Sequence, residues 1–307
     1  MNKHKINKVF KNDFFKRTIV ILIIFLILFP SFFITKYLGK FGRISGLLFF
    51  MLLSSFATFE VLKNFYLNIY INIFLIVISN LIYFLSFENF EYLINKGIDN
   101  SLAELVNQFK LNYQILAFSI ILAILLFVIS LFYNKNKKII DWVFIFISLL
   151  FIPMFGKFSF IFNVFNVWSI FIIGFIAAIS DIFGLLGGKF FGNKIFKKKL
   201  APNISPKKTW EGAIISTIFS TLFTFVCFYF TDIFNDMPNK LYFCLISSLI
   251  LPIASIFGDL LFSSLKRYLK IKDFSNILSS HGGIMDRFDS TFLVVFTLIP
   301  ILILFTF

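Results

Sequence analysis

One polar segment, residues 263–290, interrupts the apolar C-terminal part of the chain. Its charged residues, histidine and paired glycines are Lys266, Arg267, Lys270, Lys272, Asp273, His281, Gly282, Gly283, Asp286, Arg287 and Asp289. Basic side chains bind phosphates, closely spaced carboxylates hold a hard divalent cation, and glycines let backbone N–H groups approach anionic oxygens. This combination suits phosphoryl or nucleotidyl transfer. A loop that only orients a membrane protein needs lysines, but not His-Gly-Gly followed by Asp-Arg and a further Asp.

A second polar segment, residues 180–212, contains glycines and lysines after Asp181. Glycines with lysines are typical of a site that binds phosphate groups. However, Gly184 and Gly187 are not followed by Gly-Lys-Ser/Thr at the spacing of a Walker motif. The pattern therefore argues against a P-loop ATPase. We call residues 180–212 the central polar segment and residues 263–290 the C-terminal polar segment.

Asp259 lies in the apolar run that leads into the C-terminal polar segment. An ionised carboxylate costs about 2.5 to 3.5 kcal/mol at the centre of a membrane helix. Two roles are open for Asp259: an interfacial residue paired with Lys266 or Arg267, or a metal ligand. Asp286 and Asp289 are three residues apart and share a face if that stretch is helical. With Asp259 they can form an oxygen-rich site of the kind that suits Mg²⁺.

The C-terminal polar segment resembles the signature of the phosphatidate cytidylyltransferases, or CDP-diacylglycerol synthases. That signature reads S-x-x-K-R, four residues, K-D, a short spacer and H-G-G-x-x-D-R-x-D. The matching positions are Ser263, Lys266, Arg267, Lys272, Asp273, His281, Gly282, Gly283, Asp286, Arg287 and Asp289. One difference is the pair Ser279 and Ser280, where the family usually has Pro-Gly before the histidine.

The central polar segment is similar to a second block of the same family, which ends in S-P-x-K-T-x-E-G. The matching positions are Asp181, Gly188, Lys189, Gly192, Ser205, Pro206, Lys208, Thr209, Glu211 and Gly212. After Asp181 the chain reads Ile-Phe-Gly-Leu instead of the family's Thr-Gly-Ala-Tyr, so the match is weaker at that end. Two separate blocks in the expected order arise by chance much less readily than one.

The resemblance implies a nucleotidyltransferase that moves CMP from CTP to phosphatidate, giving CDP-diacylglycerol and pyrophosphate in phospholipid biosynthesis. The catalytic residues that it implies are Lys266, Arg267, His281, Asp286, Arg287 and Asp289. The substrate-binding residues that it implies are Ser205, Lys208, Thr209, Glu211, Lys272, Asp273, Gly282 and Gly283. Asp259, Asp286, Asp289 and, as a weaker candidate, Asp181 would hold Mg²⁺, and K⁺ is left open as a second ion. His281 either contacts a phosphate or orders the loop.

The composition predicts a membrane protein. Hydrophobic residues make up 59% of the 307 residues and charged residues 14%, and the mean hydropathy is +0.92. These values lie far from those of ordinary soluble domains. The net charge of +14 is explained better by anionic lipid headgroups and nucleotide phosphates than by nucleic acid. Cys227 and Cys244 lie in apolar runs without metal-like spacing, so neither a disulfide nor a metal framework is expected.

The apolar runs predict an all-α, polytopic integral membrane protein with about nine spans of roughly twenty residues. The predicted spans are 18–35, 44–62, 66–87, 113–133, 139–156, 160–186, 212–231, 241–262 and 288–307. We interpret residues 1–307 as one integral membrane domain. Its N-terminal helices occupy about residues 1–160, and its catalytic helices and loops occupy about residues 161–307.

The basic residues predict the orientation. Residues 1–17 contain six lysines and arginines before the first apolar run, and no small-residue cleavage site of a signal peptide follows. The loops near Lys63, at 135–138, at 189–208 and in the C-terminal polar segment are also basic, whereas residues 88–112 and 231–240 are acidic. The positive-inside rule then predicts a multi-pass protein of the cell (plasma) membrane, with its N-terminus and active site in the cytoplasm.

Two other functions compete with the cytidylyltransferase. A transporter would also contain acids within the membrane, such as Glu60, but no inverted repeat or pair of broken helices is evident. A CTP-dependent polyprenol kinase would transfer the terminal phosphate of CTP and release CDP. Glu60, alone in the second apolar run, either faces the substrate pocket or makes a hydrogen bond in the helix interior. The oligomeric state is open, with a homodimer as one option.

Overall fold

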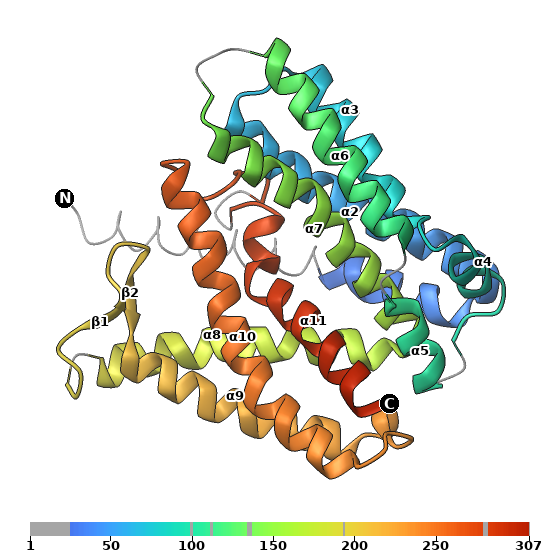
Figure 1. Cartoon of the computed structure of the whole chain (residues 1–307). Helices are drawn as coiled ribbons and strands as arrows, with labels where there is room; N and C mark the ends of the chain where they lie inside the picture. Colours follow the sequence, from blue (N-terminus) through green and yellow to red (C-terminus); the bar gives the residue numbers. More distant parts are fainter. Residues whose placement is uncertain are drawn as a thin grey trace, which may run out of the picture.

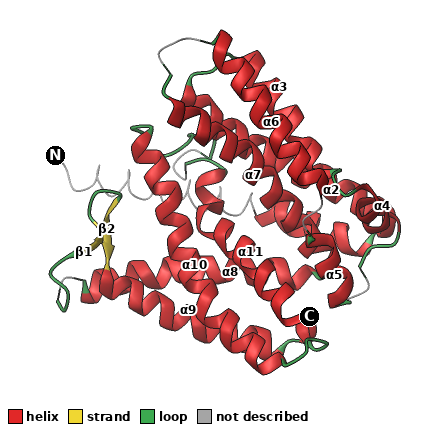
Figure 2. Ribbon diagram, viewed as in Figure 1, coloured by secondary structure: helices red, strands yellow, loops and turns green. Residues whose placement is uncertain are grey.

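A computed structural model describes residues 25–98, 101–110, 113–133, 137–192, 194–278 and 282–306, and it consists almost entirely of helices (Figures 1 and 2). The first described helix is Phe25–Tyr37. The following elements are α2 (Gly39–Leu62), η1 (Lys63–Phe65), α3 (Ile69–Asn80), η2 (Leu81–Tyr83), α4 (Phe87–Asn95), α5 (Leu102–Phe109), α6 (Tyr113–Phe132), α7 (Ile139–Phe165), α8 (Val167–Phe191), β1 (Lys199–Ala201), β2 (Ser205–Thr209), α9 (Trp210–Phe230), η3 (Asp232–Phe234), α10 (Lys240–Tyr268) and α11 (Met285–Thr306).

Seven helical stretches of the described residues are long and apolar enough to cross a membrane. They contain α2, α6, α7, α8, α9, α10 and α11. The prediction of an all-α membrane protein is therefore confirmed, but the count of nine is not. Two predicted spans correspond to shorter apolar helices, Phe25–Tyr37 and Ile69–Tyr83. The earlier part of the first predicted span, residues 18–24, lies outside the described residues.

The boundary between the fifth and sixth predicted spans is wrong. α7 continues through Lys157, because the buried Nζ of this residue donates hydrogen bonds to Ile82 O at 3.1 Å and Leu85 O at 2.8 Å. The two helices are separated instead at Asn166, whose side-chain oxygen accepts a hydrogen bond from Trp168 N at 2.9 Å. Asn166 thus satisfies one of the free N–H groups at the start of α8.

Helices α8, α9, α10 and α11, which carry the two polar segments, pack against one another as a group (Figure 1). α9 contacts α8 and α10, α10 contacts α11, and α8 also contacts α10 and α11. Glycines allow the close approach. A Cβ atom on Gly212 of α9 would lie 2.6 Å from Gly184 O of α8. A Cβ atom on Gly258 of α10 would lie 2.7 Å from Asp289 O of α11. Both contacts are too short for any other residue, so glycine sets the spacing of these helix pairs.

The remaining helices cover the other side of α11. α2 packs along α7, and both α5 and α7 contact α11. The second half of α7 is almost wholly buried, and its side chains form the centre of the apolar core with residues of α2 and α11. α4 and α5, which lie within the predicted acidic loop, are short helices of 9 and 8 residues.

A two-stranded hairpin interrupts the helices between α8 and α9. β1 and β2 are antiparallel, with Lys199 opposite Thr209 and Ala201 opposite Ser205. Thr209 is the last residue of β2 and the N-cap of α9, because its Oγ1 accepts a hydrogen bond from Gly212 N at 3.1 Å. The hairpin carries Lys208 to the end of the helix bundle.

Candidate active site

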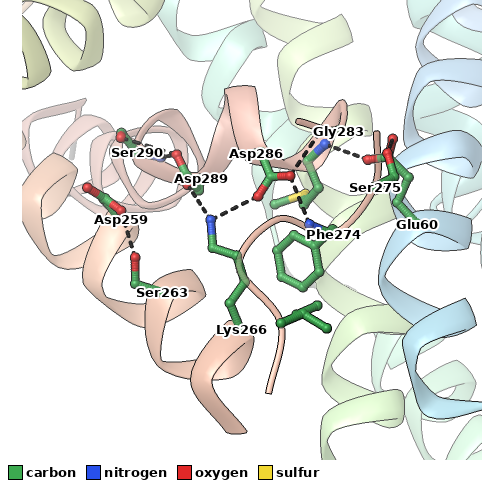
Figure 3. Close-up of polar contacts among 12 residues, drawn as sticks. Glu60, Asp259, Ser263, Lys266, Phe274, Ser275, Gly283, Asp286, Asp289 and Ser290 are labelled. Atoms are coloured by element: carbon green, nitrogen blue, oxygen red, sulfur yellow. Dashed lines mark hydrogen bonds and ion pairs between the residues drawn. The ribbon is translucent and has the colours of Figure 1, made fainter. Parts of the chain in front are cut away.

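Lys266 of α10 links two aspartates at the start of α11 (Figure 3). Its Nζ lies 2.9 Å from Asp286 Oδ1 and 3.4 Å from Asp289 Oδ2. Lys266 and Asp289 are only 8% and 9% exposed. A buried charge of this kind is stable only when it is paired, so these three side chains depend on one another.

Asp181 of α8 joins this cluster through Ser290. The hydroxyl of Ser290 donates a hydrogen bond to Asp181 Oδ2 at 2.9 Å, and Ser290 N donates to Asp289 Oδ1 at 2.8 Å. Asp181, Asp259 and Asp289 are close enough for their negative charges to repel one another. The cations Lys208 and Arg287 offset part of this repulsion at Asp181.

Lys208 and Asp259 form a second ion pair, with Nζ 2.6 Å from Oδ2. Ser263 Oγ donates a hydrogen bond to the other oxygen of Asp259 at 3.0 Å. The two charged side chains are 24% and 23% exposed, so water and small anions can reach them. This pair therefore fits the interfacial role considered for Asp259, although its partner is Lys208 instead of Lys266 or Arg267.

A cavity of about 430 Å³ opens beside this second pair. Its lining includes Asp181, Lys207, Lys208, Thr209 and Asp259. A larger cavity of about 670 Å³ lies between the ends of α2, α6, α7 and α10, but it contains none of these residues. The first of these two cavities thus joins the central polar segment to Asp259 of α10.

The loop between α10 and α11 is held by Asp286. Asp286 Oδ2 accepts hydrogen bonds from Phe274 N and Gly283 N, each at 2.9 Å. Because its other oxygen contacts Lys266, both oxygens of Asp286 have protein partners here. Gly282 supports the turn with a φ of +77°, which glycine adopts at little cost.

The other predicted residues are distributed as follows. Glu211 is buried, and its Oε1 accepts hydrogen bonds from Ile195 N and Phe196 N at 3.0 and 2.9 Å, so it orders the chain before the hairpin. Arg267 donates to Ile204 O at 3.1 Å and to Ile271 O at 3.3 Å, which ties α10 to the hairpin. Ser205 lies in β2, and Lys272 and Asp273 are exposed on the loop. His281, Ser279 and Ser280 lie outside the described residues.

Glu60 of α2 is the residue whose connection to this site the sequence did not identify. It is fully buried and accepts hydrogen bonds from Ser275 Oγ, Ile284 N and Met285 N. The signal in the sequence was a lone acid within an apolar run. Neither of the two expected roles described it, because its partners are more than 200 residues away along the chain.

The kind of ligand that Mg²⁺ prefers is present, since carboxylates from α8, α10 and α11 face one polar region. Lysines contact several of these oxygens in this arrangement. Across residues 25–306, apart from the undescribed gaps, no three His, Cys, Asp or Glu side chains converge closely enough to hold one ion. The donors thus fit Mg²⁺ by chemical type, but in this arrangement the described side chains do not converge on one ion position.

The fold and the site together define a polytopic membrane protein with a charged cavity that suits anionic phosphate groups. Residues 15–305 match the model of the cytidylyltransferase family. The chain therefore belongs to the cytidylyltransferase family.

Relatives agree with this assignment over a shorter region. The chain is 42% identical over 117 residues to a phosphatidate cytidylyltransferase of Rickettsia typhi, covering 37% of this chain and 49% of the relative. It is 39% identical over 124 residues to that of Bacillus subtilis, covering 39% and 43%. It is 42% identical over 118 residues to that of Staphylococcus haemolyticus, covering 38% and 44%. The matched segment thus spans about half the length of these relatives.

Proposed function

We propose that this protein is a phosphatidate cytidylyltransferase, which converts CTP and phosphatidate into CDP-diacylglycerol and pyrophosphate. The observation that carries the proposal is the grouping of Asp181, Asp259 and Asp289 with Lys208 and Lys266. Three members of this group, Asp181, Lys208 and Asp259, line one cavity. Opposite charges held this way suit a reaction between two anionic substrates. Family membership and the relatives' names support the same reaction.

In this reaction an oxygen of the phosphatidate phosphate attacks the α-phosphorus of CTP. The new P–O bond forms as the bond to the β-phosphate breaks, and pyrophosphate leaves with that electron pair. The phosphate of phosphatidate is already ionised near neutral pH, so no protein nucleophile is needed. The ion pair between Lys208 and Asp259 is partly exposed. The ammonium group of Lys208 can therefore leave the Asp259 carboxylate and bind a substrate phosphate instead. Lys266 and Arg287 add positive charge beside the aspartates.

The proposal includes Mg²⁺ as cofactor, held by Asp259 and Asp289, with Asp181 or Asp286 as a further ligand and K⁺ left open as a second ion. When bound, Mg²⁺ neutralises substrate phosphates that would otherwise repel each other. Asp286 also accepts hydrogen bonds from Phe274 N and Gly283 N, so it orders the loop between α10 and α11 as well.

The lipid substrate accounts for a site at the end of membrane helices. Apolar side chains also border the same cavity as Lys208, and one of them, Leu185, is 73% exposed. Acyl chains can then stay in the bilayer while the headgroup enters the polar cavity. We further propose that the protein lies in the plasma membrane with its N-terminus and this cavity on the cytoplasmic side, as the basic loops predict. A homodimer stays a prediction.

The test is product analysis with the purified protein, Mg²⁺, CTP and phosphatidate. We expect CDP-diacylglycerol by mass spectrometry, with one pyrophosphate released per lipid converted. Asp259→Asn should reduce the rate by at least about 100-fold, because it removes a charge from the centre of the site. Asp232→Asn is the matched control and should leave the rate unchanged. Asp232 lies in η3, which follows the C-terminal end of α9, whereas Lys208 precedes the N-terminal end of that helix. A phosphorylated lipid accompanied by CDP would instead indicate a kinase.

A further inference from the structure

Glu60 is a fully buried carboxylate whose hydrogen-bond partners lie on a distant part of the chain (Figure 3). Its Oε1 accepts from Ser275 Oγ at 2.5 Å and from Ile284 N at 3.0 Å, and its Oε2 accepts from Met285 N at 2.9 Å. The ion pairs found among the described residues do not include Glu60. Its charge is therefore stabilised by neutral hydrogen-bond donors, two of which are backbone N–H groups.

These two N–H groups mark the start of α11, which begins at Met285. The first N–H groups of a helix have no partner within the helix, and the helix dipole favours a negative charge beside them. Ser, Thr, Asp or Asn usually supplies this contact from just before the helix. Here a glutamate of α2, 225 residues earlier in the sequence, supplies it.

Two neighbouring contacts show that the loop before α11 packs closely against the end of α2. A Cβ atom on Gly283 would lie 2.5 Å from Glu60 Oε2, so a larger residue at this position would displace the loop. Asn64, four residues later in η1, donates a hydrogen bond to Phe274 O at 3.1 Å. α2 and the η1 turn that follows it therefore hold the loop at Met285 and again at Phe274.

The residues that follow this clamp belong to the candidate active site. Asp286 is the next residue after Met285, and Asp289 lies one helical turn further on, where both reach Lys266. Ser290 reaches Asp181 of α8 from the same turn. The place where α11 begins thus determines whether these aspartates meet their partners on α8 and α10.

We propose that Glu60 is a positioning residue of the candidate active site, which holds the start of α11 against α2 so that Asp286 and Asp289 stay within reach of Lys266. The effect on catalysis rests on the proposed cytidylyltransferase activity, whereas the clamp itself does not. Glu60 acts through these aspartates and has no contact with substrate in this role.

The experiment compares Glu60→Gln, Glu60→Asp and Thr58→Val in the purified full-length protein. Glutamine keeps the size of the side chain, but its NH₂ group would face a backbone N–H donor. Aspartate keeps the charge on a shorter side chain. Thr58 is also fully buried on α2, and its hydroxyl donates a hydrogen bond within the helix, to Ser54 O at 2.7 Å, so it serves as the matched control.

We expect Glu60→Gln to lower kcat at least about tenfold at equal folded fraction, with KM for CTP within about twofold. Glu60→Asp should recover part of this loss, and Thr58→Val should behave as the unsubstituted protein. Hydrogen exchange at the amides of Ile284 and Met285 should accelerate at least about tenfold in Glu60→Gln, by less in Glu60→Asp, and not in Thr58→Val.

Unchanged exchange at these two amides in Glu60→Gln would overturn the proposal. So would a loss of activity that only follows the folded fraction, as expected of a residue that merely stabilises the fold. If the unsubstituted protein forms no CDP-diacylglycerol, the proposed function fails on its own. The exchange rates of Ile284 and Met285 then decide whether the clamp exists.

Discussion

Lys266 makes the closest polar link between α10 and α11. Its Nζ contacts Asp286 and Asp289 and also lies 5.4 Å from the centre of the Phe274 ring. Removing one member of a buried ion pair is more costly than removing the whole pair, because an uncompensated charge stays behind. The contribution of Lys266 therefore depends on whether its two acidic partners are still present.

Lys266→Met should destabilise the protein by about 3 to 5 kcal/mol, since it leaves two largely buried carboxylates without their cation. The double variant Lys266→Met with Asp286→Asn should lose less stability than the sum of the two single variants. Thermal unfolding in detergent, followed by tryptophan fluorescence, measures both effects. Additive losses would mean that the ion pair is not formed in solution.

Lys208 differs from Lys266 because its ion pair with Asp259 is partly open to solvent. Lys208→Met should lower kcat/KM for CTP by about 100-fold, which corresponds to about 2.7 kcal/mol. Stability should change by less than about 1 kcal/mol, because solvent reaches this partly exposed pair and weakens its attraction. Steady-state kinetics and thermal unfolding distinguish the two quantities. Lys194→Met, whose ammonium lies 5.7 Å from the Phe191 ring, is the control.

At the scale of the elements, the contact between α10 and α11 depends on Gly258. Gly258→Ala would place a methyl group 2.7 Å from Asp289 O and 3.1 Å from Ser290 O, and these are backbone atoms that cannot turn away. The helices must separate, so we expect a loss of about 1 to 3 kcal/mol in stability and a clear loss of activity. Gly174→Ala is a matched control in α8, because a Cβ there would meet nothing within 4 Å.

Both variants are measured by thermal unfolding and by CDP-diacylglycerol formation. Gly174→Ala should be neutral or slightly stabilising, since alanine favours a helix over glycine. If both variants behave alike, the glycine at 258 does not set the helix spacing.

The sequence predicted most of these elements from their apolar length, because each membrane helix needs about twenty apolar residues whatever its neighbours. It could not predict that α7 continues past Lys157, since this lysine is satisfied by carbonyl groups of Ile82 and Leu85. The sequence could not identify the hydrogen-bond partners of Glu60 either, because they lie more than 200 residues away along the chain. The short spacing within the two polar segments was informative, whereas contacts between distant segments required the fold.

At the scale of the whole molecule, exposed apolar side chains cover most of the membrane helices, and the hairpin that carries Lys199 and Lys207 lies at one end of them. The proposed orientation puts this hairpin in the cytoplasm and the loop that contains Asp236 on the other side. Single cysteines at these ends test it in a background without Cys227 and Cys244.

In sealed, right-side-out vesicles, Asp236→Cys should react with an impermeant maleimide, and Lys198→Cys should react only after the membrane is opened. Both positions are exposed, so access to the reagent is limited by the membrane and not by burial. The opposite labelling pattern would reverse the proposed orientation and place the cavity outside the cytoplasm.

The most direct test of the central proposal follows the phosphorus atoms of CTP. The purified protein is incubated with phosphatidate, Mg²⁺ and CTP that is labelled in either the α- or the γ-phosphate. Cytidylyl transfer predicts that only the α-label enters the lipid, that the γ-label leaves as pyrophosphate, and that Asp289→Asn abolishes both. Entry of the γ-label into lipid, or no transfer by a fully folded protein, would contradict the account.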